Sequence, residues 1–108
     1  MERRKWHAIY TKPRREKKVH TLLVQKGIES FCPLNKVLRQ WSDRMKVVEE
    51  PLFKSYVFVR VGEQERTAVR LVNGVINFVY WMGKPAVVKD REIKMVQQFL
   101  DLYTDIQV

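Results

Sequence analysis

Residues 51–59 read PLFKSYVFV, and this stretch decides the fold class that we expect for the chain. Its last four residues alternate aromatic and β-branched side chains: Tyr56, Val57, Phe58 and Val59. Successive side chains of a strand point to opposite faces, so one face of this strand carries valines and the other carries rings. The valines suit a core under helices, and the rings predict an open face that a partner could cover. The alternative is that another part of the chain folds over the rings.

Hydrophobic periodicity predicts strands and helices in alternation around this stretch. Residues 5–11 alternate like a strand, and Val19, Leu22 and Leu23 form the apolar stripe of a helix between Pro13 and Gly27. The further elements we expect are a strand over 28–34, a polar hairpin over 36–53 with its turn at 42–44, the strand over 55–61, a short helix over 63–72, a strand over 75–80 and a last helix capped by Asp90.

This order predicts an α+β fold with a mostly antiparallel sheet and split β-α-β crossovers, in which helices lie mainly on one face. The short helix is expected to turn Thr67, Ala68, Leu71 and Val72 inward or toward a partner. The stripe of the last helix is Ile93, Val96, Phe99 and Leu100. A chain of 108 residues with 45% hydrophobic residues is expected to form one domain over 1–108.

The positive charge is concentrated near the N-terminus. The chain carries a net charge of +9, and residues 1–26 hold nine Lys or Arg against Glu2 and Glu16, which places seven of these charges there. Within the first helix Arg14, Lys17 and Lys18 fall opposite the apolar stripe. A charge run can be only a solvated face, but an excess in one quarter of the chain favours a polyanionic partner.

Other function classes find little support in the sequence. His7 and His20 lie on different elements, Cys32 is the single cysteine, and no acidic pair has the spacing of an acid–base site. We therefore expect no catalytic residues, no metal, no cofactor and no small-molecule substrate. No apolar run is long enough for a signal peptide or a membrane span, so the expected location is the cytoplasm, without a membrane partner.

Six motifs in order and with compatible spacing resemble the N-terminal domain of NusG-family transcription elongation factors. They are WHAIYTKPRRE (6–16), GIESFCP (27–33), WSDR (41–44), PLFKSYVFV (51–59), NGVINFV (73–79) and GKPAVV (83–88). The resemblance covers residues 6–100. Within the family the chain looks more like the operon-specific antiterminator paralogues than the general factor.

The resemblance implies that the open aromatic face docks on the clamp helices of the largest RNA polymerase subunit. The positions that match this surface are Tyr10, Phe53, Tyr56, Phe58 and Phe78. It further implies that Lys12, with Arg14 and Arg15 beside it, contacts the non-template DNA strand, and the outward Lys17 and Lys18 extend this basic edge. Arg66 and Thr67 correspond to the part that approaches the opposite pincer of the polymerase. Bridging both pincers would favour the closed clamp and suppress pausing.

Two departures from the family pattern bear on this inference. The family commonly reads P-L-F-P-G-Y where this chain has Lys54 and Ser55, so the local turn lacks both its proline and its glycine. The sequence also shows no second, barrel-like KOW domain before Val108.

Two other interpretations stay open. The stretch KSYVFVRV (54–61) comes close to the octamer of RNA-recognition sheets, whose exposed aromatics stack on bases. In this chain Val57 replaces the small residue of that octamer, and Val61 replaces its last aromatic. A ribosome-associated structural protein would rest on basicity alone.

Overall fold

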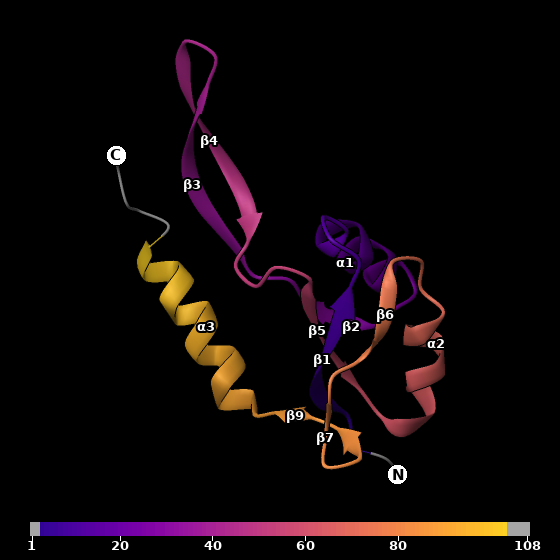
Figure 1. The fold of residues 1–108 in the computed structure, drawn as a ribbon. Helices are drawn as coiled ribbons and strands as arrows, with labels where there is room; N and C mark the ends of the chain where they lie inside the picture. The colour runs from indigo at the N-terminus through magenta and orange to yellow at the C-terminus, as the bar shows by residue number, and fades with distance from the viewer. Residues whose placement is uncertain (1–2, 104–108) are drawn as a thin grey trace.

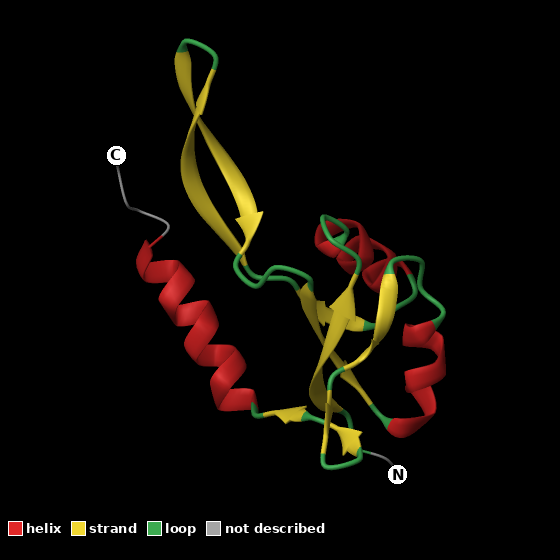
Figure 2. Ribbon diagram, in the orientation of Figure 1, coloured by secondary structure: helices red, strands yellow, loops and turns green. Residues whose placement is uncertain are grey.

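The computed structural model describes residues 3–103, and its helices and strands follow the expected order except that the short strands β7, β8 and β9 stand between β6 and α3 (Figures 1 and 2). The strands are β1 Lys5–Thr11, β2 Glu29–Phe31, β3 Leu34–Trp41, β4 Arg44–Pro51, β5 Tyr56–Val61, β6 Val75–Phe78, β7 Tyr80–Trp81, β8 Lys84–Pro85 and β9 Val87–Val88. The helices are α1 Glu16–Gln25, the single 3-10 turn η1 Glu63–Glu65, α2 Arg66–Arg70 and α3 Asp90–Tyr103.

The main sheet has the order β2-β5-β1-β6, and every pair in it is antiparallel. β9 pairs with the first half of β1, where Trp6 lies opposite Val88, and β6 pairs with the second half. Figure 1 shows α1 and α2 on one side of this sheet and α3 on the other. The α+β class with an antiparallel sheet is therefore confirmed, with α1 and α2 on one face and α3 on the other.

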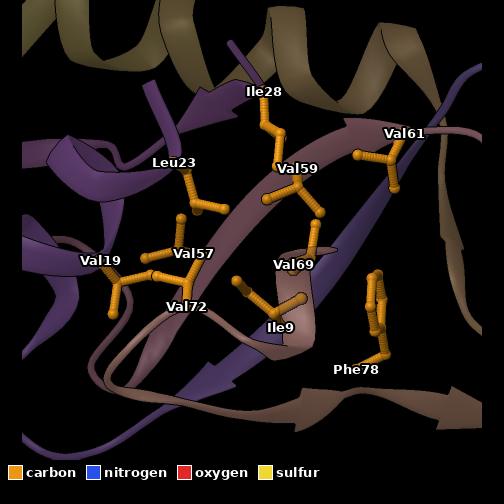
Figure 3. Packing of buried hydrophobic residues seen from close by; sticks show 10 residues of the cluster. All are labelled: Ile9, Val19, Leu23, Ile28, Val57, Val59, Val61, Val69, Val72 and Phe78. Atoms are coloured by element: carbon orange, nitrogen blue, oxygen red, sulfur yellow. The ribbon is translucent and has the colours of Figure 1, made fainter. Parts of the chain in front are cut away.

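The core lies between the sheet and the pair α1 and α2, as Figure 3 shows. Val57 and Val59 of β5 are fully buried there together with Ile9 of β1, Leu23 of α1 and Val69 of α2. Burying such a side chain contributes about 1.5–3 kcal/mol relative to leaving it exposed. The alternation read from the sequence thus assigned the valines to the covered face correctly.

The end of α1 is fixed by Gly27, which adopts a φ of +78°. The N–H of Ile28 donates to the carbonyl of Leu23 at 3.0 Å, and the N–H of Gly27 donates to that of Val24 at 2.9 Å. This pair of bonds is a Schellman motif, in which glycine reverses the chain at no steric cost. Ile28 and Leu23 both join the core, so the turn leads directly into β2.

The short helix turns only part of the expected set inward. Val69 and Val72 are buried and Ala68 packs against the core, whereas Leu71 is 73% exposed and Thr67 is exposed. Because α2 has only five residues after a 3-10 turn, a stripe extrapolated from a longer regular helix holds only in part, and Thr67 and Leu71 lie on the surface.

The last helix also begins differently. The sequence predicts Asp90 as its cap, but Asp90 is its first helical residue, and the backbone N–H of Lys89 donates to the carboxylate of Glu92 at 2.8 Å. This is the carboxylate half of a capping box. Ile93 is 4% exposed, while Phe99 further along the expected stripe is 45% exposed.

β3 and β4 form the predicted hairpin, which projects away from the sheet in Figure 1. Its turn includes Ser42, whose φ is +59°. The molecule is consequently elongated, with extents of 53 × 28 × 27 Å.

Candidate functional site

Aromatic side chains form a continuous row on the face of the sheet opposite α1 and α2. Register explains the row: Phe58 lies opposite Phe31 of β2 and Ala8 of β1, and Tyr56 lies opposite Tyr10. We call this surface the aromatic face; it comprises Trp6, Tyr10, Phe31, Phe53, Tyr56 and Phe58.

The rings touch each other in pairs along the row. Ring centroids are 5.1 Å apart for Tyr10 and Tyr56, 5.5 Å for Phe53 and Phe58, 6.2 Å for Phe31 and Phe58 and 6.4 Å for Trp6 and Phe31. Separations of this size give aromatic pairs an attraction beyond area burial, so the row holds its shape before a partner arrives.

Exposure varies along the row. Tyr10 is 37% and Phe53 36% exposed, whereas Trp6 at the other end is 8% exposed. The row is therefore accessible at the end with Tyr10 and Phe53 and buried at the end with Trp6. The set expected from the sequence lacks Trp6 and Phe31. Strand alternation counted back from Tyr10 would have predicted Trp6 as a member, because residues 6, 8 and 10 share one face of the strand.

Phe78 does not belong to the aromatic face, and its expected placement there is wrong. It is 1% exposed, lies opposite Ile9 in the β1–β6 register and packs edge-on against His7 at 5.8 Å. The guanidinium of Arg70 lies 5.1 Å from its ring centroid. β6 carries an apolar residue on each parity, Val75 on one and Phe78 on the other, so the sequence could not tell which face each side chain takes.

The basic edge follows β1 directly. Lys12, Arg14, Arg15, Lys17 and Lys18 are all exposed, on the loop after β1 and the first turn of α1. The loop is anchored by its backbone, because the N–H of Lys12 donates to the carbonyl of Gly74 at 2.9 Å. The structure thus brings the five predicted residues together on one short segment.

Only one of these cations has a partner within residues 3–103. The ammonium of Lys17 donates to the backbone carbonyl of Glu49 at 2.6 Å and ties α1 to the hairpin. Arg14 and Lys17 also line an open hollow of about 590 Å³ together with Lys54. The side chains of Lys12, Arg14, Arg15 and Lys18 are therefore available to a ligand.

Arg66 and Thr67 begin α2, on the other side of the sheet from the aromatic face. Thr67 is exposed, and Arg66 is half-buried with an Nε that meets no acceptor among the described residues. The structure therefore does not bring this pair together with the rings.

The two histidines have structural partners. His7 is 2% exposed, and its Nδ1–H donates to the carbonyl of Ala86 at 2.9 Å, which fixes the tautomer of the neutral ring. Burial lowers the pKa of His7, and the charges of Arg66 and Lys5 act in the same direction. Burial also lowers the pKa of His20, which is hydrogen-bonded to the hydroxyl of Ser30.

Two further groups are held in their neutral forms. Burial, with a contribution from Glu16, raises the pKa of Cys32 to about 11, so its thiol is not activated. A hydrogen bond with Tyr10 raises the pKa of Tyr56, which keeps this part of the aromatic face uncharged. Within residues 3–103 no three His, Cys, Asp or Glu side chains gather as metal ligands, and no helix has the length and apolarity to cross a membrane.

Comparison with known proteins agrees with this architecture. Residues 4–97 match the family model described as transcription termination factor NusG. Among solved structures, one of Thermotoga maritima NusG that addresses domain interaction in that protein is similar, with a TM-score of 0.63 and 26% sequence identity. The match covers 96% of this chain and 60% of that one, so this chain spans less than two thirds of its length. No curated protein gives a significant match. Because the family model spans most of the chain, this protein belongs to the NusG family of transcription factors.

Proposed function

We propose that this chain, as a single N-terminal-like domain, acts as a transcription elongation and antitermination factor that binds the clamp helices of the largest RNA polymerase subunit. The observation that carries the proposal is the aromatic face, which stays accessible at Tyr10 and Phe53 on a rigid sheet. Family membership supplies the context, since members of this family act on transcription and interact with RNA polymerase.

The chemistry of the aromatic face suits a helical partner. Tyr56 and Phe58 offer large apolar area with two side-chain torsions each, so little conformational entropy is lost on binding. The end of a helical pair can insert between such rings and bury its apolar residues, as in other helix-in-groove interfaces. A few aromatic anchors commonly carry most of the binding free energy.

The basic edge is the proposed contact to the non-template strand of the transcription bubble. Lys12, Arg14 and Arg15 carry three charges without an acidic partner among the described residues, and they lie beside the end of β1. Exposed Lys and Arg side chains contact mainly the phosphates of a nucleic acid and not the edges of its bases. This contact therefore positions the protein on the strand.

Arg66 and Thr67 would supply the contact to the opposite pincer. Their position across the sheet from the rings suits a bridge, because the two surfaces then face different parts of the polymerase. A factor that binds the closed clamp better than the open clamp shifts the population toward the closed state by its difference in affinity. No chemical step is required of the protein.

A direct binding comparison tests the proposal. The chain is immobilised and offered core RNA polymerase in one arm and single-stranded RNA in the other. We expect retention of polymerase, with loss of retention when isolated clamp helices are added as competitor. Retention of RNA alone would contradict the proposal.

That contrary outcome would favour an RNA-recognition sheet instead. One observation supports this second candidate: Tyr56 and Phe58 are half-buried on the sheet face opposite α1 and α2, beside the exposed Tyr10, where bases could stack. Replacing Phe58 would then weaken RNA binding, and core polymerase would not be retained.

A further inference from the structure

A second concentration of positive charge lies at the opposite end of β1 from the basic edge. It lines an open cavity of about 830 Å³, which we call the basic pocket. Six of its ten lining residues are Lys or Arg and only Asp90 is acidic; the six are Arg3, Arg4, Lys5, Arg60, Lys89 and Arg91. The hollow beside the basic edge carries four cations against three carboxylates, so the basic pocket has the larger excess.

Strand pairing assembles the basic pocket from three distant parts of the chain. Trp6 lies opposite Arg60 of β5 on one side and opposite Val88 of β9 on the other. The segment that follows β9, with Lys89 and Arg91, is thereby brought beside the residues that precede β1. β1 advances about 3.3 Å per residue, so about 20 Å separates this pocket from the basic edge.

Few of these charges are neutralised by the protein itself. Arg4 is paired with Glu65 at 2.9 Å, and Arg60 lies 3.6 Å from Glu29. Within residues 3–103 the side chains of Arg3, Lys5, Lys89 and Arg91 have no acidic partner. The Nε of Arg60 is buried and meets no acceptor there, which is the kind of donor that a bound water or ion commonly satisfies.

We propose that the basic pocket binds the phosphodiester backbone of a nucleic acid. Four of its six cations are arginines, whose planar guanidinium groups bind phosphate oxygens in pairs. A transcription factor works where nucleic acid is the abundant polyanion, and several charges gathered in one cavity match a repeating phosphate chain. The site is distinct from the proposed non-template contact, and it adjoins the aromatic face at Trp6.

The test measures nucleic-acid binding by the full chain without polymerase, as a function of potassium chloride concentration. Labelled single-stranded DNA, RNA of the same sequence and the DNA duplex are the three probes. The pocket variant carries Arg3→Ala, Lys89→Ala and Arg91→Ala. The matched control carries Lys26→Ala, Lys36→Ala and Arg44→Ala, which remove three exposed charges elsewhere.

We expect the pocket variant to reduce the slope of log affinity against log salt by about 2 for single strands, because each phosphate contact contributes about 0.7. On the duplex the slope would fall by about 2.7. A larger fall on the duplex than on the single strands would identify duplex DNA as the ligand. The control should leave the slope unchanged. A version with Arg3→Lys and Arg91→Lys keeps the charge and should keep the slope, which excludes a folding defect as the cause.

The proposal is overturned by a slope in the pocket variant equal to that of the control on all three probes. If that variant then also loses binding of a polyglutamate peptide, the pocket serves an acidic protein segment instead.

Discussion

The carboxylate of Glu16 accepts the backbone N–H of Ser55 at 2.7 Å, which joins the start of α1 to the turn before β5. Glu16 is 5% exposed, and Ser55 has a φ of +67°, a conformation that favours glycine. Ser55 stands where the family pattern commonly has glycine, so the chain keeps the left-handed turn with a less suited residue. The bond from Glu16 helps to hold that turn beside both the aromatic face and the basic edge.

Ser55→Gly should therefore stabilise the protein. A non-glycine residue in the left-handed region costs about 1–2 kcal/mol, and glycine removes most of this cost but adds freedom to the unfolded chain. We expect the free energy of unfolding to rise by about 0.5–1 kcal/mol in urea denaturation. Ser42→Gly, at another left-handed position in the hairpin turn, is a useful comparison. A decrease in stability for Ser55→Gly would show that the hydroxyl makes a needed contact.

The core assignment of α1 is tested by two neighbouring residues. Leu23 is fully buried, and Leu23→Ala should lower the free energy of unfolding by about 2–5 kcal/mol because it leaves a cavity. Val24 is 54% exposed, and Val24→Ala should change stability by about 0.5 kcal/mol or less. Equal melting temperatures for the two variants would mean that α1 does not pack on the sheet through this side.

The aromatic face should carry polymerase affinity rather than fold stability. Phe58→Ala is expected to weaken binding to core polymerase by about 2 kcal/mol or more, roughly 30-fold in Kd, because it removes a central anchor. Val57→Ala, one residue away but fully buried, should destabilise the fold instead. Binding titrations and thermal melts of both variants separate the effects. A polymerase Kd unaltered by Phe58→Ala would remove this face from the interface.

The basic edge should act through DNA alone. The combined change Lys12→Ala, Arg14→Ala and Arg15→Ala is expected to abolish the antipausing effect on a bubble template while core polymerase binding persists. The salt slope of DNA-dependent activity should fall by about 0.7 for each lost contact. Arg44→Ala, Lys84→Ala and Lys94→Ala together form the control. Full antipausing activity by the edge variant would leave these cations as a solvated surface.

Stability should fall as the medium becomes acidic, through His7. Its pKa is lowered in the folded protein, so near and below the ordinary value of about 6.5 the unfolded chain binds more protons than the native chain. The free energy of unfolding should thus decrease as pH falls from 7 toward 5. His7→Asn can still donate to the carbonyl of Ala86 but cannot titrate, so its urea midpoints should depend less on pH. An unaltered pH profile in His7→Asn would place the effect elsewhere, with His20 as the next candidate.

The sequence by itself determined the features that rest on short-range geometry. Strand alternation placed Val57 and Val59 in the core and Tyr56 and Phe58 on the opposite face, since the side-chain period of a strand is fixed by its backbone. The apolar stripe of α1 and its end at Gly27 followed from helix geometry and from the tolerance of glycine for positive φ.

Only the tertiary structure decided the features that depend on pairing between distant segments. Phe78 lies in the core because the β1–β6 register, which shifts between Tyr10 and Thr11, sets it opposite Ile9, and the short strand β6 has no alternation that fixes its face. Arg60 and Arg91 meet in one pocket because β5 and β9 flank β1 at Trp6. Register is a property of two strands together, so no single stretch of sequence contains it.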